Sequence, residues 1–171
     1  MRIVQILPVL AFGDAVGNDT RALKDALSEA GYETEIYAAV IDERLPQGTA
    51  QPFERLGKLT AKDIVIYHLS NGHRLNYEIE KLGGKKVIIY HNITPERYFE
   101  KYNRDACANC VQGIKAAKRL AKTADYAIAV SEYNKQDLIR LGFTCDIEVL
   151  PILIPFEDYK KRPNAGVLRR Y

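Results

Sequence analysis

Six short apolar runs recur along the chain, and segments with helical spacing of apolar residues lie between them. The runs cover residues 2–7, 34–40, 63–69, 86–91, 126–130 and 146–150. Short continuous runs of this kind are typical of parallel strands that are covered on both faces. Their alternation with helical segments predicts an α/β fold. We therefore expect a Rossmann-like three-layer sandwich around a mainly parallel sheet of six strands.

Apolar residues three or four positions apart predict the helices. Leu23 and Leu27 follow this spacing, and Gly31 stands where a glycine commonly ends a helix. Gly142 has the same place after a later stripe. The remaining stripes consist of Phe53, Leu56 and Leu59; Leu75, Ile79 and Leu82; Ile114, Ala117, Leu120 and Ala121; and Leu138 and Leu141.

The run at residues 86–91 delivers His91 and Asn92 directly to a predicted helix start. Thr94 is a good N-cap residue, and Pro95 suits the first helical position, where its missing N–H costs nothing. His91 and Asn92 therefore lie at the carboxyl end of a strand, where open α/β sheets bind ligands. The alternative is a hydrogen-bonded, half-buried histidine that only completes the strand end.

Gly13 and Gly17 belong to the loop after the first run and predict a place for a phosphate group. Glycines let backbone N–H groups approach an anion at the start of the following helix. Their spacing matches neither the dinucleotide fingerprint nor the P-loop. The alternative is a tight turn followed by a helix that Asn18 or Asp19 caps.

Polar residues also follow the first, third and fifth runs, at the same predicted rim of the sheet. All three histidines belong to this set. Loops are polar in most proteins, so the clustering favours a binding site only modestly. Besides His91 and Asn92, the set contains Asp14, His68, Ser70, Asn71, His73, Ser131, Glu132 and Tyr133.

Composition narrows the range of functions. A chain of 171 residues, 47% of them hydrophobic, is long enough for one well-buried core. The net charge of +3 comes without a basic and aromatic stripe, so we expect no nucleic-acid partner. No apolar run approaches the roughly 20 residues of a membrane span. We expect a cytoplasmic location, with or without peripheral contact at the inner membrane face.

The three cysteines are an odd number, which favours a reducing compartment. Cys107 and Cys110 form a single CxxC without a second pair and without a histidine close in sequence. We therefore expect them to pack as small hydrophobic residues near a helix start rather than to bind a metal. The sequence predicts no metal site and no cofactor.

The end of the chain differs from the rest. Pro151 and Pro155 enclose an apolar patch, and the residues that follow are polar and basic. Two prolines so close together disfavour a helix or a central strand. We expect a domain at residues 1–150 and a linker at 151–171 toward a C-terminal domain. Ile152 and Ile154 are expected to fold back on the sheet, whereas Phe156 completes the apolar patch.

Six segments occur in a specific order along nearly the whole chain: GDAV at 13–16, AGY at 30–32, DIVIYH at 63–68, YHNITP at 90–95, ADYAIAVS at 124–131 and VLP at 149–151. Together they resemble the N-terminal domain of family-four retaining glycosyltransferases of the GT-B fold. In that family the N-terminal domain mainly binds the acceptor. A second Rossmann-like domain holds the sugar nucleotide with a pair of glutamates.

The resemblance implies a hexosyltransferase that moves a sugar from a nucleotide-sugar donor to a hydroxyl acceptor, such as a glycan or a lipid-linked glycan. It also implies that this chain is the acceptor half and is inactive alone. Retaining transfer of this type needs no protein nucleophile and often no metal. Two alternatives stay open: a stand-alone, non-enzymatic Rossmann-like domain that binds a ligand or a partner, and half of a sugar-nucleotide epimerase.

The resemblance also implies roles for particular residues. His91 matches the histidine that contacts the transferred sugar, and is the expected catalytic residue, with more effect on rate than on stability. Gly13 and Gly17 are expected to shape the loop near the donor phosphates, although Asp14 and Ala15 stand where the family commonly has two glycines. The expected acceptor-binding residues are Asp14, His73, Asn92 and Ser131.

Overall fold

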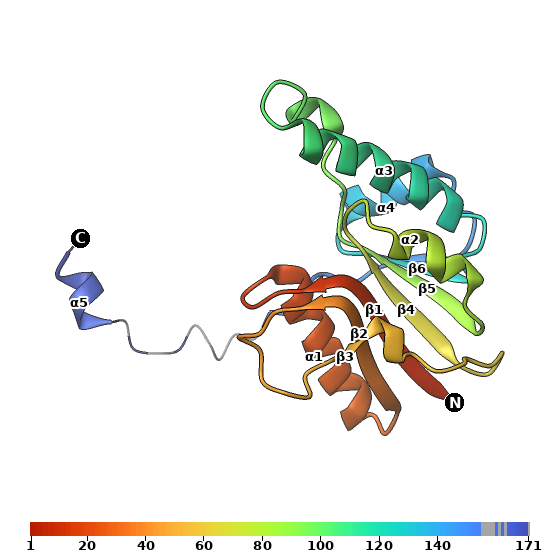
Figure 1. Cartoon of the computed structure of the whole chain (residues 1–171), viewed down its shortest axis with the longest axis horizontal. Coiled ribbons are helices and arrows are strands. Elements are labelled where there is room, and N and C mark those ends of the chain that lie inside the picture. Colours follow the sequence, from red (N-terminus) through yellow and green to blue (C-terminus); the bar gives the residue numbers. More distant parts are fainter. Residues whose placement is uncertain (155–159, 161, 163, 171) are drawn as a thin grey trace.

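We describe residues 1–154, 160, 162 and 164–170 of a computed structural model of the chain. Seven strands form one sheet in the order β3-β2-β1-β4-β5-β6-β7, and every neighbouring pair is parallel (Figure 1). The strands are β1 (Arg2–Leu10), β2 (Glu33–Ile41), β3 (Gln51–Pro52), β4 (Ile64–Leu69), β5 (Lys85–Tyr90), β6 (Tyr126–Ala129) and β7 (Ile147–Val149).

The expected parallel α/β sheet is confirmed, but the expected number of six strands is wrong. The additional strand, β3, is two residues long and pairs with Tyr37 and Ala38 of β2 at the edge of the sheet. Its proline is tolerated there because an edge strand has one side without ladder hydrogen bonds. A strand this short leaves no apolar run in the sequence.

The helices are α1 (Ala15–Glu29), α2 (Leu75–Glu78), α3 (Arg104–Leu120), α4 (Glu132–Leu141) and α5 (Ala165–Leu168). Within residues 1–154, 3₁₀ turns occupy Phe53–Arg55, Ile79–Lys81 and Glu96–Tyr98. Among the helices of the described residues, none is both long and apolar enough to cross a membrane.

Two of the expected helix ends are confirmed. After α1, Gly31 adopts φ +85°, and the N–H of Tyr32 donates to the carbonyl of Leu27. After α4, Gly142 adopts φ +95°, and the N–H of Phe143 donates to the carbonyl of Leu138. Glycine is favoured at both places because a left-handed backbone lets these amides reach the last free carbonyls of the helix.

The expected helix start at Thr94 and Pro95 is wrong. Only the 3₁₀ turn Glu96–Tyr98 follows there, and it has no side-chain cap. The long helix α3 begins later, where the side chain of Asn103 accepts a hydrogen bond from the N–H of Ala106. The capping residues near this strand end therefore placed the helix start nine residues too early, because Asn103 rather than Thr94 caps α3.

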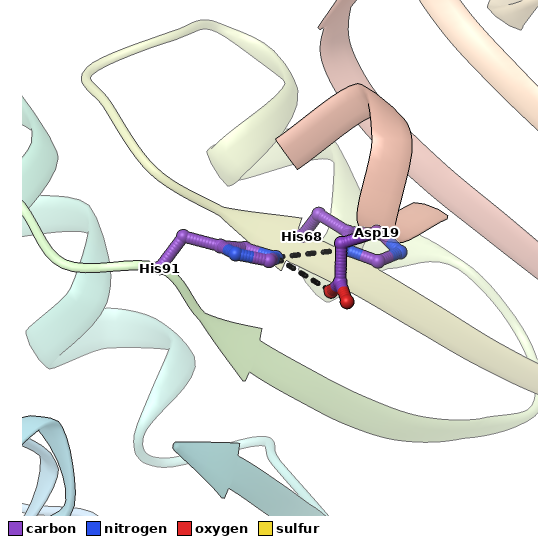
Figure 2. Close-up of side chains that lie close together, drawn as sticks. All are labelled: Asp19, His68 and His91. Carbon is purple, nitrogen blue, oxygen red and sulfur yellow. Dashed lines mark hydrogen bonds and ion pairs between the residues drawn. The ribbon is translucent and has the colours of Figure 1, made fainter. Parts of the chain in front are cut away.

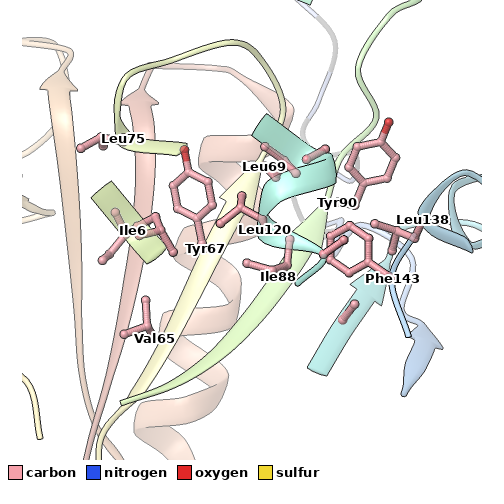
Figure 3. Packing of buried hydrophobic residues seen from close by; sticks show 14 of the residues in the cluster. Ile6, Val65, Tyr67, Leu69, Leu75, Ile88, Tyr90, Leu120, Leu138 and Phe143 are labelled. Carbon is pink, nitrogen blue, oxygen red and sulfur yellow. The ribbon is translucent and has the colours of Figure 1, made fainter. Parts of the chain in front are cut away.

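The larger apolar core lies on the face of the sheet that α2, α3 and α4 cover. Tyr67 of β4 and Tyr90 of β5 pack there with Leu120 of α3 and Leu138 of α4 (Figure 3). On the opposite face, one smaller cluster packs against Leu23 and Leu27 of α1. It consists of Ile3, Ile66 and Ile89, with Leu23, Leu27, Ile64, Val87, Ile128 and Val130 at its margin.

The strand order reverses between β1 and β4. From β1 the chain continues to β2 and β3 on one side, and from β4 it continues to β5, β6 and β7 on the other. The loops that follow β1 and β4 diverge at such a point and leave a crevice at the carboxyl ends of the strands, where α/β sheets bind ligands.

Candidate functional site

Three polar side chains enter the sheet face that α1 covers. In the strand register, Gln5 of β1 lies opposite Ile66 of β4, and His68 of β4 lies opposite Ile89 of β5. Side chains alternate between the two faces along a strand. Gln5, His68 and His91, which lies two residues beyond Ile89, therefore point to the same face. His91 continues the ladder, because its N–H donates to the carbonyl of Leu69.

The first two turns of α1 complete this group with Asp19. We call Gln5, Asp19, His68 and His91 the rim cluster. His68 Nε2 lies 2.9 Å from Gln5 Oε1, and His68 Nδ1 lies 2.9 Å from His91 Nε2. Asp19 Oδ2 lies 3.9 Å from His91 Nε2. In Figure 2 the His91 side chain extends from the loop after β5 toward both His68 and Asp19.

The two imidazole rings lie end to end. Their centroids are 5.2 Å apart and the facing nitrogens are 2.9 Å apart. The difference is accounted for by the distance from each centroid to its own facing nitrogen, so both nitrogens lie on the line that joins the centroids. The angle between the ring planes is 21°, which makes the rings nearly coplanar rather than stacked face to face. A lone pair of one ring therefore faces the other ring's nitrogen along the line that an N–H···N hydrogen bond requires.

Asp19, His68 and His91 are also the residues that could hold a metal ion. One ligand atom from each lies within 4.8 Å of the others. Tetrahedral coordination, however, needs lone pairs that converge on one centre at an angle. The in-line arrangement of the two histidines instead fits a single proton between two nitrogens, so coordination would require one ring to leave its present position.

Burial keeps both histidines of the rim cluster neutral. Burial, reinforced by the neighbouring His91, lowers the pKa of His68 well below its ordinary value. Burial lowers the pKa of His91 to about 4, against an opposing effect of the Asp14 carboxylate. The His91 side chain is 1% exposed. The cluster can therefore exchange hydrogen bonds at neutral pH without carrying positive charge.

Asp19 is the only carboxylate in the rim cluster, and one backbone N–H among the described residues donates a hydrogen bond to it. Burial raises its pKa, and one backbone hydrogen bond, from the N–H of Leu153 at 2.8 Å, acts in the opposite direction. The segment after β7 thus folds back over the carboxyl rim. The expected fold-back agrees with the half-buried Ile152 but is wrong for Ile154, which is 49% exposed. Phe156 lies outside the described residues.

The loop between β1 and α1 is organised by Asp14. Its Oδ2 accepts a hydrogen bond from the N–H of Gly17 at 3.1 Å and so caps α1, so the cap is neither Asn18 nor Asp19, which the alternative interpretation had named. Gly13 adopts φ +75°. At Gly17 an added Cβ would lie 3.0 Å from the carbonyl oxygen of Ala11. A phosphate at the Gly17 amide would have to replace the Asp14 carboxylate.

A pocket of about 270 Å³ lies at the carboxyl ends of β1 and β4. Its lining includes Ser70, two residues after His68, but none of the four rim-cluster residues. Asp14, whose charge acts on His91, is one of its walls. A larger hollow, about 450 Å³, lies along α1 and is lined by none of the expected site residues. The residues that line the smaller pocket are Leu7, Pro8, Val9, Ala11, Asp14, Val16, Ser70 and Asn71.

The other expected acceptor-binding residues contribute to the local structure of their own segments. Ser131 caps α4, where its Oγ accepts a hydrogen bond from the N–H of Asn134 at 3.2 Å. His73 Nδ1 accepts one from the N–H of Leu75 at 3.2 Å. Asn92 has a left-handed backbone with φ +75°. In the described part of the chain, none of the three contributes to the rim cluster or lines the smaller pocket.

Three members of the rim cluster were not among the expected site residues. His68 was placed in the polar set at the rim but received no role, Gln5 stands inside an apolar run, and Asp19 was considered only as a cap. The sequence signal that could have identified Gln5 and His68 was a polar residue inside an apolar run, because a buried polar group needs a hydrogen-bond partner. Gln5 and His68 supply such partners to each other. No signal of this kind marked Asp19.

Comparison with known proteins assigns no family to the chain. No protein-family model matches it, and no curated protein matches it.

Proposed function

We propose that this chain is the acceptor-binding half of a retaining glycosyltransferase, which transfers a sugar from a nucleotide-sugar donor to a hydroxyl acceptor. The observation that carries the proposal is the position of His91. This residue, which matches the sugar-contacting histidine of family-four enzymes, is a neutral imidazole in a polar cluster at the switch point of the sheet. Six sequence segments in the order of that family support the same proposal.

The chemistry of such a site is binding and orientation. A neutral imidazole can hold a sugar hydroxyl by a hydrogen bond without adding a charge to the reacting centre. Fixing the hydroxyl groups of two substrates in a reactive orientation accounts for much of the rate in such reactions, together with preorganised electrostatics. In the proposed enzyme the second Rossmann-like domain binds the nucleotide, and the pocket beside Asp14, Ser70 and Asn71 takes the acceptor.

Titration of the ¹⁵N-labelled 171-residue chain with methyl glycosides and, separately, with UDP-glucose and GDP-mannose tests this proposal. We expect the glycosides to shift the backbone amide signals of Asp14, Ser70 and Asn71, with little response to the nucleotides. A nucleotide that saturates the same amides while no glycoside does so would favour the stand-alone ligand-binding domain instead.

A second test concerns activity. We expect the 171-residue chain to fold alone and to transfer no sugar from either nucleotide, because the proposed donor site belongs to another domain. Measurable turnover by this chain would contradict the assignment of donor binding to a second domain. The coding sequence beyond Tyr171 offers an independent test, since a second α/β domain with paired glutamates would support the enzyme.

A further inference from the structure

The proton positions in the rim cluster follow from its one amide. Gln5 is fully buried, and its Oε1 lies 2.9 Å from His68 Nε2. A carbonyl oxygen only accepts hydrogen bonds. His68 therefore carries its proton on Nε2, and its other ring nitrogen, Nδ1, has a free lone pair.

That lone pair determines the state of His91. His68 Nδ1 faces His91 Nε2 at 2.9 Å in line, so the proton of this hydrogen bond must come from His91. The Asp19 carboxylate, 3.9 Å from the same nitrogen, favours a proton there as well. With Gln5 turned the other way, a bare His91 Nε2 would face this carboxylate, which is electrostatically unfavourable.

His91 Nδ1 is consequently a bare acceptor. It is buried, and no hydrogen-bond partner reaches it among the described residues. A buried polar atom without a partner destabilises the folded state, so folded proteins contain few of them. Asp14, a wall of the smaller pocket, is close enough to act on the His91 pKa.

We propose that Gln5 and His68 are positioning residues that hold His91 in the tautomer with a bare Nδ1, so that the site takes its ligand through a hydroxyl group that donates to this nitrogen. This inference rests on the proposed function for the identity of the ligand, a sugar. The relay from Gln5 through His68 to His91 rests on the geometry alone.

The tautomers are measured directly with the 171-residue chain. Two-bond ¹H–¹⁵N spectra of the histidine side chains at pH 7 distinguish protonated from bare ring nitrogens, and single His→Gln variants assign the signals. We expect one neutral tautomer, with the proton on Nε2, for His68 and His91. His73, which is outside the cluster, serves as the internal comparison. A proton on Nδ1 of His91 would overturn the relay.

Two matched substitutions test whether Gln5 sets the tautomer. Gln5→Met preserves the length of the side chain but removes the acceptor, and we expect His91 to become a mixture of its two tautomers. Gln5→Glu preserves an acceptor, and we expect it to retain the single tautomer. If Gln5→Met lowered the melting temperature yet left the His91 tautomer unchanged, Gln5 would be structural only. The spectrum of the unmodified chain tests the relay even if a variant fails to fold.

Ligand binding is followed at the same nitrogen. We expect methyl glycosides to move the His91 Nδ1 resonance toward the protonated range, and UDP-glucose, whose proposed site belongs to another domain, to leave it unchanged. The expected tautomer without a response to any sugar would overturn the assigned ligand and the proposed function but not the relay. Sugar binding with the opposite tautomer would overturn the relay alone. Stoichiometric binding of Zn²⁺ by both histidines at pH 7 would replace the hydroxyl site with a metal site.

Discussion

Two buried carboxylates at opposite ends of the sheet have opposite environments. Asp63 precedes β4 at the amino end and accepts hydrogen bonds from the N–H of Arg2 at 2.9 Å and from the N–H and hydroxyl of Thr60 at 2.8 and 3.0 Å. These bonds, first that of Arg2, lower the pKa of Asp63 to about 2. Within the described part of the chain, Asp19 at the carboxyl end accepts one backbone hydrogen bond, and burial raises its pKa.

We infer from these two environments that the amino end of the sheet contributes to stability, whereas the carboxyl end contributes to function. Around Asp63 the ionised carboxylate is satisfied on both oxygens, so it ties β1 and the loop before β4 together. Around Asp19 the rim cluster retains two buried atoms without a described partner, Gln5 Nε2 and His91 Nδ1. A folded domain tolerates such unsatisfied polarity where a ligand supplies the missing partner. We therefore expect substitutions at the amino end to reduce stability and substitutions at the carboxyl end to reduce activity.

The largest expected effect is on catalysis. In the enzyme with both domains, His91→Gln should lower turnover roughly 100-fold, the usual loss for a positioned polar group. Glutamine retains a donor toward His68 and much of the volume, but it lacks the bare ring nitrogen. His91→Ala should have the same effect and also reduce stability, because the side chain is buried rather than exposed as a strand-end residue would suggest. Unchanged turnover of both variants, measured by sugar transfer, would remove His91 from the mechanism.

Acid should destabilise the carboxyl end first. The folded protein keeps His91 neutral with a pKa of about 4, below the ordinary value of 6.5, so the unfolded chain binds more protons between these pH values. The free energy of unfolding should therefore be intact above pH 6.5 and fall by on the order of 3 kcal/mol toward pH 4. His68, with its lowered pKa, acts in the same direction. Urea unfolding at several pH values measures this dependence.

The acid response has an internal control at the other end of the sheet. The lowered pKa of Asp63 contributes stability above its ordinary value of 3.8, and that stability is lost only as the pH falls from there toward 2. Asp19, with its raised pKa, opposes the histidine effect because the folded state takes up its proton more readily. His91→Gln should flatten the response between pH 6.5 and 4. An equally steep response in this variant would place the titrating groups elsewhere.

Asp63→Asn should lower the melting temperature at pH 7 by several degrees. An asparagine carries an NH₂ group, which would face the N–H of Arg2 or of Thr60 in place of a carboxylate oxygen. The binding signals of Asp14, Ser70 and Asn71 with glycosides should remain, because this residue lies at the opposite end of β4. Loss of glycoside binding by Asp63→Asn without a lower melting temperature would contradict the proposed difference between the two ends of the sheet.

Asp19→Asn is the matched substitution and should have a small effect on stability. The asparagine oxygen can still accept from Leu153, and the buried charge disappears, so the free energy of unfolding should rise by at most about 1 kcal/mol. Thermal unfolding beside Asp63→Asn provides the test. A greater loss of stability at Asp19 than at Asp63 would show that the rim carboxylate is structural.

The smallest effects are expected at the CxxC segment. Cys110 is buried in the larger core and Cys107 is half-buried, both as free thiols. Replacing both with serine should cost about 1 kcal/mol or less, mostly from Cys110, and leave glycoside binding unchanged. Release of a stoichiometric metal from the unmodified chain, measured by elemental analysis, would contradict the structural role.

The sequence by itself determined the architecture. Runs such as 63–69 and 86–91 are apolar because both sheet faces are covered, and this local pattern predicts parallel strands wherever it occurs. Gly31 and Gly142 mark helix ends because the left-handed backbone there has few alternatives. The same logic placed His91 and Asp14 at the carboxyl rim. The edge strand β3 was missed because two residues form no periodic pattern.

Only the tertiary structure decided which rim residues meet. Whether Gln5, His68 and His91 share a face depends on the register between three strands, and a shift of one residue would send a side chain to the opposite face. Asp19 joins them only because α1 packs on that face, and its hydrogen-bond partner Leu153 is 134 residues away in sequence. His73 and Ser131 have similar local patterns but remain outside the cluster. Local patterns determine elements through neighbouring residues, whereas a site is a set of distances between elements, which packing alone establishes.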